Sequence, residues 1–118
     1  MPRILYVEDN DDLRETIGLL MQETPCDLVL CASGEAALSA WRAVPFDLIV
    51  TDISLPGMSG VDLAKQVLAV TPRQWIAICS GYDMGQSLES FGPNVRTLPK
   101  PFEVDELLAL LNEISGRA

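Results

Sequence analysis

Residues 4–12 read ILYVEDNDD, an apolar run that passes directly into four acids and an asparagine. The apolar part, ILYV, has the composition of a buried strand. The acids that follow it lie close together in sequence, and like charges repel one another, so the cluster costs stability unless something offsets it. The acidic part is therefore either a solvated loop or helix start, or a site that binds a cation.

Short apolar runs recur along the chain and alternate with longer amphipathic segments. The expected strands are residues 3–7, 26–32, 47–51, 75–80 and 95–98, and the expected helices are residues 11–23, 34–44, 60–70 and 103–115. Runs that are apolar on both faces suit parallel strands covered by helices on both sides. The repeated strand–helix order predicts an α/β fold with right-handed crossovers around one parallel sheet.

The bulk composition bounds the class of protein. The chain has 118 residues, of which 48% are hydrophobic, so we expect a single domain over residues 1–118 with no further output domain in this chain. The formal net charge is −9, which argues against direct binding of nucleic acid and of anionic membrane surfaces. Apolar runs in the sequence are all far shorter than the roughly 20 residues that span a bilayer.

Histidine and cysteine usage narrows the chemistry. The chain has no histidine, which excludes an imidazole base, ligand or phosphodonor within it. The three cysteines, Cys26, Cys31 and Cys79, lie in or beside apolar runs. We interpret them as small buried side chains in a protein of the reducing cytoplasm rather than as a disulfide framework.

Polar residues close the expected strands. Glu8 and Asp9 follow the first strand, Asp52 the third, Ser80 the fourth and Lys100 the fifth. In open parallel sheets, ligands bind beyond the carboxyl ends of the strands. If the strand order is 2-1-3-4-5, the first and third strands are neighbours, and Asp9 and Asp52 meet there with Ser80 and Lys100 on the far side.

This combination of residue types indicates phosphoryl chemistry assisted by a metal. Carboxylate oxygens are the ligands that Mg²⁺ prefers, and Mg²⁺ pairs naturally with phosphate. A carboxylate can itself accept a phosphoryl group, while a lysine and a hydroxyl stabilise the phosphoryl oxygens. Each residue alone has a plain structural explanation, and we expect residues 10–12 only to start and cap a helix. The joint placement at one edge of the sheet favours a site.

Four segments in order resemble the receiver domain of two-component response regulators. They are LYVED at 5–9, DLIVTDISLPGMSG at 47–60, ICSGY at 78–82 and LPKPF at 98–102. The resemblance covers essentially the whole chain. It implies a flavodoxin-like, doubly wound sheet of five parallel strands in the order 2-1-3-4-5.

The resemblance also implies roles for the residues at the strand ends. Asp52 would be the phosphoacceptor, and Mg²⁺ would be held by Glu8, Asp9, Asp52 and the backbone carbonyl of Ser54. Ser80 and Lys100 would bind phosphoryl oxygens, and the peptide bond between Lys100 and Pro101 would be cis. The donor would be a phosphohistidine on a sensor histidine kinase or a histidine phosphotransfer protein, and phosphorylation would switch the binding of an output protein.

The chain departs from the family pattern in two places. Thr97 stands where receivers usually carry an aromatic residue that switches rotamer with the hydroxyl residue. The segment 81–94 is rich in glycine and leaves room only for a short helix near residues 84–90. Neither the usual aromatic switch nor the usual output face is therefore expected here.

Three other functions compete with a working receiver. A degenerate receiver used as a scaffold would not need the full set of Asp9, Asp52, Ser80 and Lys100. An aspartyl-phosphate hydrolase of the haloacid-dehalogenase type needs a second acid two residues after the nucleophile, where this chain has Ser54. A flavin-binding electron carrier needs a hydroxyl- and glycine-rich phosphate loop after the first strand, where this chain has acids.

Overall fold

The computed structural model describes residues 2–22, 25–80, 92, 94–99 and 104–116. The strands are β1 (Arg3–Val7), β2 (Asp27–Cys31), β3 (Leu48–Asp52), β4 (Trp75–Ser80) and β5 (Val95–Pro99). The helices are α1 (Asp11–Met21), α2 (Gly34–Ala43), α3 (Gly60–Val70) and α5 (Val104–Gly116). The strands form one parallel sheet in the order β2-β1-β3-β4-β5, which confirms the predicted flavodoxin-like fold.

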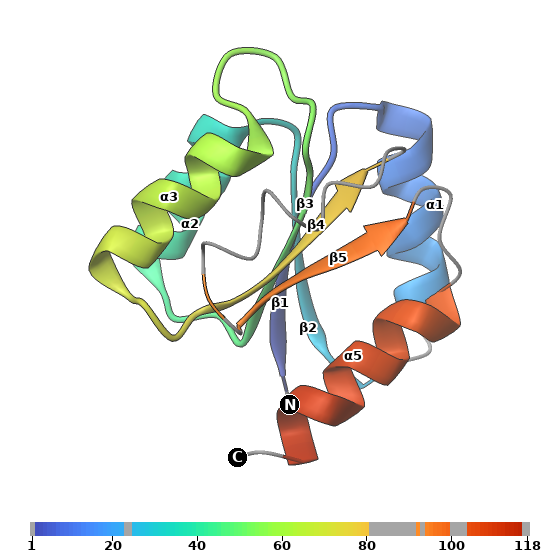
Figure 1. Cartoon of the computed structure of the whole chain (residues 1–118). Helices are drawn as coiled ribbons and strands as arrows, with labels where there is room; N and C mark the ends of the chain where they lie inside the picture. Colours follow the sequence, from blue (N-terminus) through green and yellow to red (C-terminus); the bar gives the residue numbers. More distant parts are fainter. Residues whose placement is uncertain (1, 23–24, 81–91, 93, 100–103, 117–118) are drawn as a thin grey trace.

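Two helical layers cover the sheet, with α2 and α3 on one face and α1 and α5 on the other (Figure 1). Alternate residues of each strand point to opposite layers. In β1, Leu5 and Val7 pack in the cluster on the α2 and α3 side, whereas Ile4 and Tyr6 pack in the cluster on the α1 and α5 side. This two-sided burial is the reason why β1 is a continuous apolar run after its first residue.

Element boundaries follow the sequence expectation within one or two residues wherever both ends are described. β1, β4 and α3 match the expected ranges, while β2 is shorter at each end and β3 begins and ends one residue later. The helical spacing in residues 11–23 predicts an inward face of Leu13, Ile17, Leu20 and Met21, and this prediction is wrong for Leu20. Leu20 is 52% exposed, because it precedes the buried Met21 by one residue and so lies about 100° around the helix from it.

Polar side chains define the starts of three helices. Asn10 caps α1 by accepting from the backbone N–H of Leu13, and Ser33 caps α2 in the same way at Ala36. Ser59 and Asp62 form a reciprocal capping box at α3. Each cap satisfies a backbone donor that the helix itself cannot pair. The expectation that residues 10–12 start and cap the first helix is confirmed.

Gly60 marks the closest backbone approach among the described glycines. A Cβ atom built on it would lie 2.2 Å from the carbonyl oxygen of Asp52. Its N–H also donates to the carbonyl of Ile53, at 3.0 Å. The chain thus turns back on itself after β3 and enters α3 directly beside the strand end.

Gly60→Ala is expected to destabilise the fold by about 3 kcal/mol, because the new methyl group has only backbone to displace. Urea unfolding followed by circular dichroism measures the difference. Gly18→Ala is the matched control: a Cβ there meets only the end of the Leu30 side chain, at 3.0 Å, and alanine favours a helix interior. That variant should unfold at the same or a higher urea concentration, and equal losses in the two variants would contradict the steric explanation.

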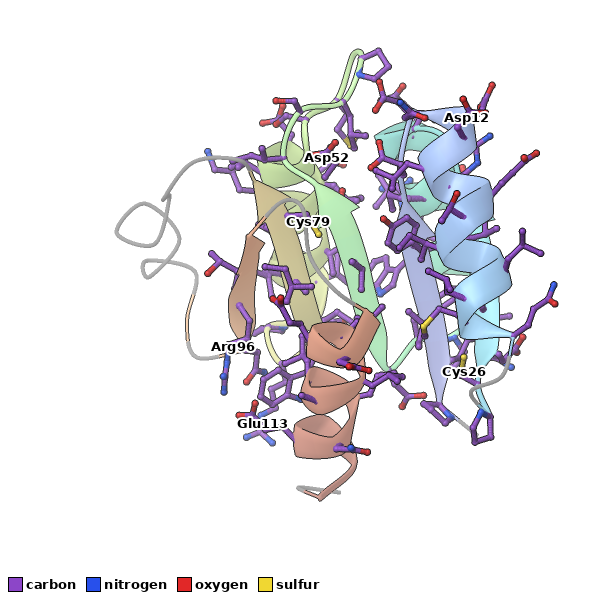
Figure 2. The ribbon with its side chains drawn as sticks, turned by 90° about the vertical axis from the view of Figure 1, so that its right-hand side faces the viewer. Asp12, Cys26, Asp52, Cys79, Arg96 and Glu113 are labelled. Carbon is purple, nitrogen blue, oxygen red and sulfur yellow. The ribbon has the colours of Figure 1, made fainter. Side chains whose placement is uncertain are left out.

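The cysteines have the predicted character. Cys31 and Cys79 are buried, Cys26 is half-buried, and all three are free thiols. Figure 2 labels Cys26 and Cys79. Burial raises the pKa of Cys26 and of Cys31, which keeps both as neutral thiols. In the described part of the chain, no helix has both the length and the apolar character needed to cross a membrane.

Several sequence expectations fall outside the described residues. They are the short helix near residues 84–90, Lys100, and the cis bond between Lys100 and Pro101.

Candidate functional site

Strand register brings the first and third strand ends together. Val7 of β1 pairs with Thr51 of β3, so the next residues along the two strands, Glu8 and Asp52, stand side by side. Their side chains follow those of Tyr6 and Val50, which point to the α1 and α5 layer. The strand order 2-1-3-4-5 therefore brings the acids at the ends of the first and third strands together, as the sequence predicts.

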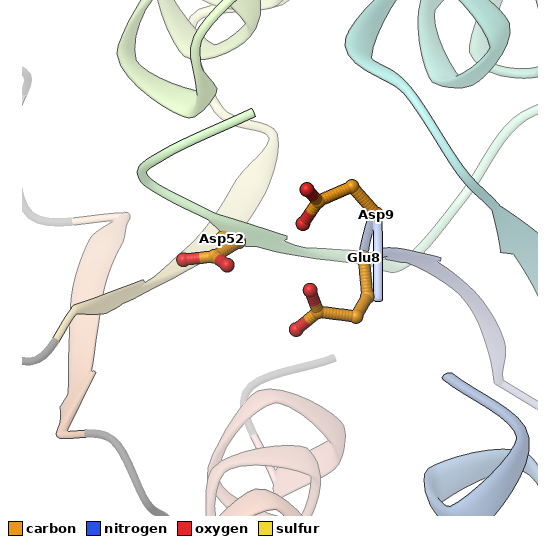
Figure 3. A group of neighbouring side chains, drawn as sticks. All are labelled: Glu8, Asp9 and Asp52. Carbon is orange, nitrogen blue, oxygen red and sulfur yellow. The ribbon is translucent and has the colours of Figure 1, made fainter. Parts of the chain in front are cut away.

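Glu8, Asp9 and Asp52 form one acidic cluster. Each offers a carboxylate oxygen, and the three oxygens lie within 4.8 Å of one another. Figure 3 shows the carboxylates of Glu8 and Asp9 at the end of β1 directed toward the space beside Asp52. Glu8 is buried, Asp52 is half-buried and Asp9 is exposed, so the cluster opens from the sheet edge to solvent.

Several hydrogen bonds hold the turn between β1 and α1. The Glu8 carboxylate accepts from the N–H of Asn10, and the Glu8 carbonyl accepts from the Arg14 guanidinium at 2.8 Å. Arg14 also forms an ion pair with Asp11, which lies beside the cluster but outside it. The arginine thereby fixes the peptide that joins Glu8 to Asp9, and with it the direction of both acids.

Tyr6 lies beneath the cluster in the core and is 2% exposed. Burial raises the pKa of its phenol well above the ordinary value, and Cys79, Glu8 and Asp52 act in the same direction. The phenol therefore stays neutral and adds no further negative charge below the acids.

The segment after β3 is held at both ends. The N–H of Ile53 donates to the carbonyl of Cys79 on β4, and the N–H of Gly60 donates to the carbonyl of Ile53, each at 3.0 Å. Ser54 lies exposed within this segment, two residues after Asp52. Its backbone carbonyl as a metal ligand stays a prediction.

Ser80 and Lys100 are the remaining predicted site residues. Ser80 ends β4, one residue beyond Cys79, which pairs with Asp52. The Ser80 side chain and the whole of Lys100 are outside the described residues. Thr97, in place of the usual aromatic residue, is exposed on β5 and pairs with Ile78.

The cluster has the chemistry of a hard-cation site. Its donors are all carboxylate oxygens, and their mutual repulsion is relieved when a divalent cation lies between them. The donor set suits Mg²⁺, which takes a few carboxylates and keeps several waters, better than Zn²⁺, which favours nitrogen and sulfur ligands.

Two residues that bond to the backbone near the site were not identified from the sequence. Arg14 had a weak local signal, since it follows Asp11 by one helical turn and is the only cation in α1. Glu35 of α2 accepts from the backbone N–H of Met58, at 3.0 Å, in the segment after β3. It had no signal, because its partner lies 23 residues away in sequence.

Comparisons with known proteins agree on one family of domains for this chain. Residues 4–112 match the family model of the response regulator receiver domain. The chain is 29% identical to the response regulator receiver protein CpdR of Brucella abortus, over 97% of this chain and 94% of CpdR. It is 33% identical to part of the virulence sensor protein BvgS of Bordetella pertussis, over 98% of this chain but 10% of BvgS. It spans about half the length of several other curated relatives.

A solved structure gives the same result for the fold. The response regulator TrrA of Thermotoga maritima, in complex with Mg²⁺ and BeF, superimposes with a TM-score of 0.85 at 28% identity. The superposition covers 97% of this chain and 99% of TrrA. Because the family model matches nearly the full length of this chain, the chain belongs to the receiver domains of two-component response regulators.

Proposed function

We propose that this chain is a single receiver domain over residues 1–118 that accepts a phosphoryl group on Asp52, with Mg²⁺, and thereby switches the binding of an output protein. The observation that carries the proposal is the convergence of Glu8, Asp9 and Asp52 within 4.8 Å at the carboxyl edge of the sheet. A receiver used only as a scaffold has no need of this convergence.

The metal would be held by the three carboxylates of the cluster and by the carbonyl of Ser54. As membership of the receiver family implies, we assign direct contact with the metal to Asp9 and contact mostly through water to Glu8. When bound, Mg²⁺ neutralises charge on the phosphoryl oxygens during transfer. The Arg14 contact to the Glu8 carbonyl keeps both acids aimed at that place.

The transfer step uses Asp52 as the nucleophile. One carboxylate oxygen of Asp52 attacks the phosphorus of a phosphohistidine on the partner kinase or phosphotransfer protein. The P–N bond breaks as the P–O bond forms, and the leaving imidazole takes up a proton. Water later hydrolyses the resulting aspartyl phosphate, which returns Asp52 to the carboxylate and releases inorganic phosphate.

Ser80 and Lys100 would bind the phosphoryl group on Asp52. The Ser80 hydroxyl donates to one phosphoryl oxygen and the Lys100 ammonium pairs with another, which offsets the charge that the phosphoryl group brings. The strand-end position of Ser80 supports its part.

The surrounding biology follows from the same assignment. Transfer from a phosphohistidine and response by protein binding make this a signalling domain rather than a metabolic enzyme, and we place it in the cytoplasm. The acidic net charge of −9 supports protein partners rather than direct contact with nucleic acid. The family match does not favour the scaffold or the hydrolase alternative.

The test is phosphorylation of the purified chain by a small-molecule donor such as acetyl phosphate. With Mg²⁺ present, intact mass spectrometry should show the gain of one phosphoryl group, which alkali removes as expected for an acyl phosphate. Addition of EDTA should prevent the gain, because the donor and Asp52 then repel each other without a counter-charge. A chain that gains no phosphoryl group from any donor, kinases of its source organism included, would contradict the proposal.

A further inference from the structure

We infer that Glu35 of α2 is a positioning residue that holds the segment between β3 and α3, residues 53–59, in the shape that the metal site needs. The inference rests on the proposed function, since it concerns Mg²⁺ binding at the same cluster. It begins from one contact: a Glu35 carboxylate oxygen accepts from the backbone N–H of Met58 at 3.0 Å.

Segment 53–59 is held at its two ends by backbone hydrogen bonds and a helix cap, and between them Leu55 and Met58 pack partly buried against the core. The Gly60 N–H donates to the Ile53 carbonyl, the Ile53 N–H donates to the Cys79 carbonyl on β4, and the capping box of Ser59 and Asp62 forms the start of α3. Ser54 and the residues after it lie between these anchors and are mostly exposed. The bond from the Met58 N–H to Glu35 lies one residue before the cap at Ser59, and it adds a fixed point that restricts the conformations open to the exposed residues before it.

Packing shows that the segment is shaped around α2. A Cβ atom on Gly34 would lie 3.0 Å from the carbonyl oxygen of Met58, so the first turn of α2 lies directly against it. Gly57 has a φ of 74°, and a Cβ on it would lie 3.3 Å from a carboxylate oxygen of Glu35. Glycine at position 57 thus both permits the turn and leaves space for the carboxylate.

The consequence for the metal is geometric. Mg²⁺ demands near-ideal octahedral geometry, so a ligand that shifts by a fraction of an ångström binds poorly. The Ser54 carbonyl lies on the same segment that Glu35 holds, four residues before Met58. Groups that orient ligands without touching the metal commonly change metal affinity by about 10- to 100-fold when they are removed. Glu35 is exposed, so its effect belongs at the lower end of that range.

Three variants separate positioning from charge. Glu35→Ala removes both the bond and a negative charge. Glu35→Gln removes the charge but keeps a carbonyl oxygen that can accept from the Met58 N–H. Glu15→Ala removes the same charge from an exposed site on α1 that has no part in the segment.

In the experiment, each variant of the 118-residue chain is titrated with Mg²⁺ while its amide NMR spectrum is recorded. The chemical shift of the Met58 amide reports directly on its hydrogen bond to residue 35. We expect Glu35→Ala to raise the Mg²⁺ dissociation constant about tenfold and to shift the Met58 amide. Glu35→Gln and Glu15→Ala should stay within about twofold of the parent chain, because a single screened surface charge contributes little. Thermal unfolding checks that all three variants are folded.

Two results would overturn the inference alone. One is an unchanged Mg²⁺ affinity in Glu35→Ala while the parent chain binds the ion. The other is an equal loss in Glu35→Ala and Glu35→Gln, which would assign the effect to charge. A parent chain that binds no Mg²⁺ would instead overturn the proposed function together with this inference.

Discussion

Asp52→Asn is expected to abolish phosphorylation of the chain by acetyl phosphate and Mg²⁺. The amide cannot form the acyl phosphate, and the substitution also removes one of the three negative charges that converge in the acidic cluster. Intact mass measured over a time course should show no phosphoryl gain in the variant under conditions that label the parent chain.

The matched control for this experiment is Asp47→Asn. Asp47 lies just before the opposite end of β3, where its carboxylate accepts from the backbone N–H of Arg3 at 2.7 Å. The substitution makes the same change of charge and keeps an acceptor, so labelling should be unaffected. Asp52→Asn itself should unfold at the same or a higher temperature, because it relieves repulsion within the cluster. Labelling that persists in Asp52→Asn would show that another group is the acceptor.

Asp9→Ala is expected to raise the dissociation constant for Mg²⁺ by about 100-fold or more, since a direct ligand contributes at least as much as the groups that orient it. The same variant should lose most of its phosphorylation by acetyl phosphate, because the charge of the incoming phosphoryl group is then poorly neutralised. Isothermal titration calorimetry measures the first effect and intact mass measures the second.

Asp12→Ala is the comparison that makes this result specific. Asp12 is an exposed acid in the first turn of α1, three residues after Asp9 and outside the cluster (Figure 2). Its removal changes the net charge by the same amount, so a general electrostatic attraction for cations would weaken equally in both variants. Equal losses would therefore contradict the assignment of Asp9 as a ligand.

Much of the fold was predictable because its signals are local. A strand buried on both faces has to be apolar throughout, and β1 and β4 have the expected bounds for that reason. Helix caps are local too, as Ser33 and Asn10 bond to backbone only three residues away. Leu20 was the exception, since its periodicity matched an inward face but the sheet covers only the stripe through Ile17 and Met21.

The acidic cluster was predictable for a related reason. Residues that close parallel strands gather at one edge of the sheet, so Glu8, Asp9 and Asp52 could be grouped once the strands were placed. The strand order had to come partly from family resemblance. The two edge strands, β2 and β5, contain polar residues, whereas β1 and β4 are nearly all apolar, but this local pattern does not say which strands are neighbours.

The sequence alone therefore determined the secondary elements, the layer architecture and the acids of the candidate site. Only the tertiary structure decided how those acids are supported. The Arg14 contact to the Glu8 carbonyl and the Glu35 contact to Met58 each join a side chain to a backbone group on another segment. Such contacts depend on how a helix and a loop meet in space, and backbone donors and acceptors are the same at every residue, so no residue type marks the partner in advance.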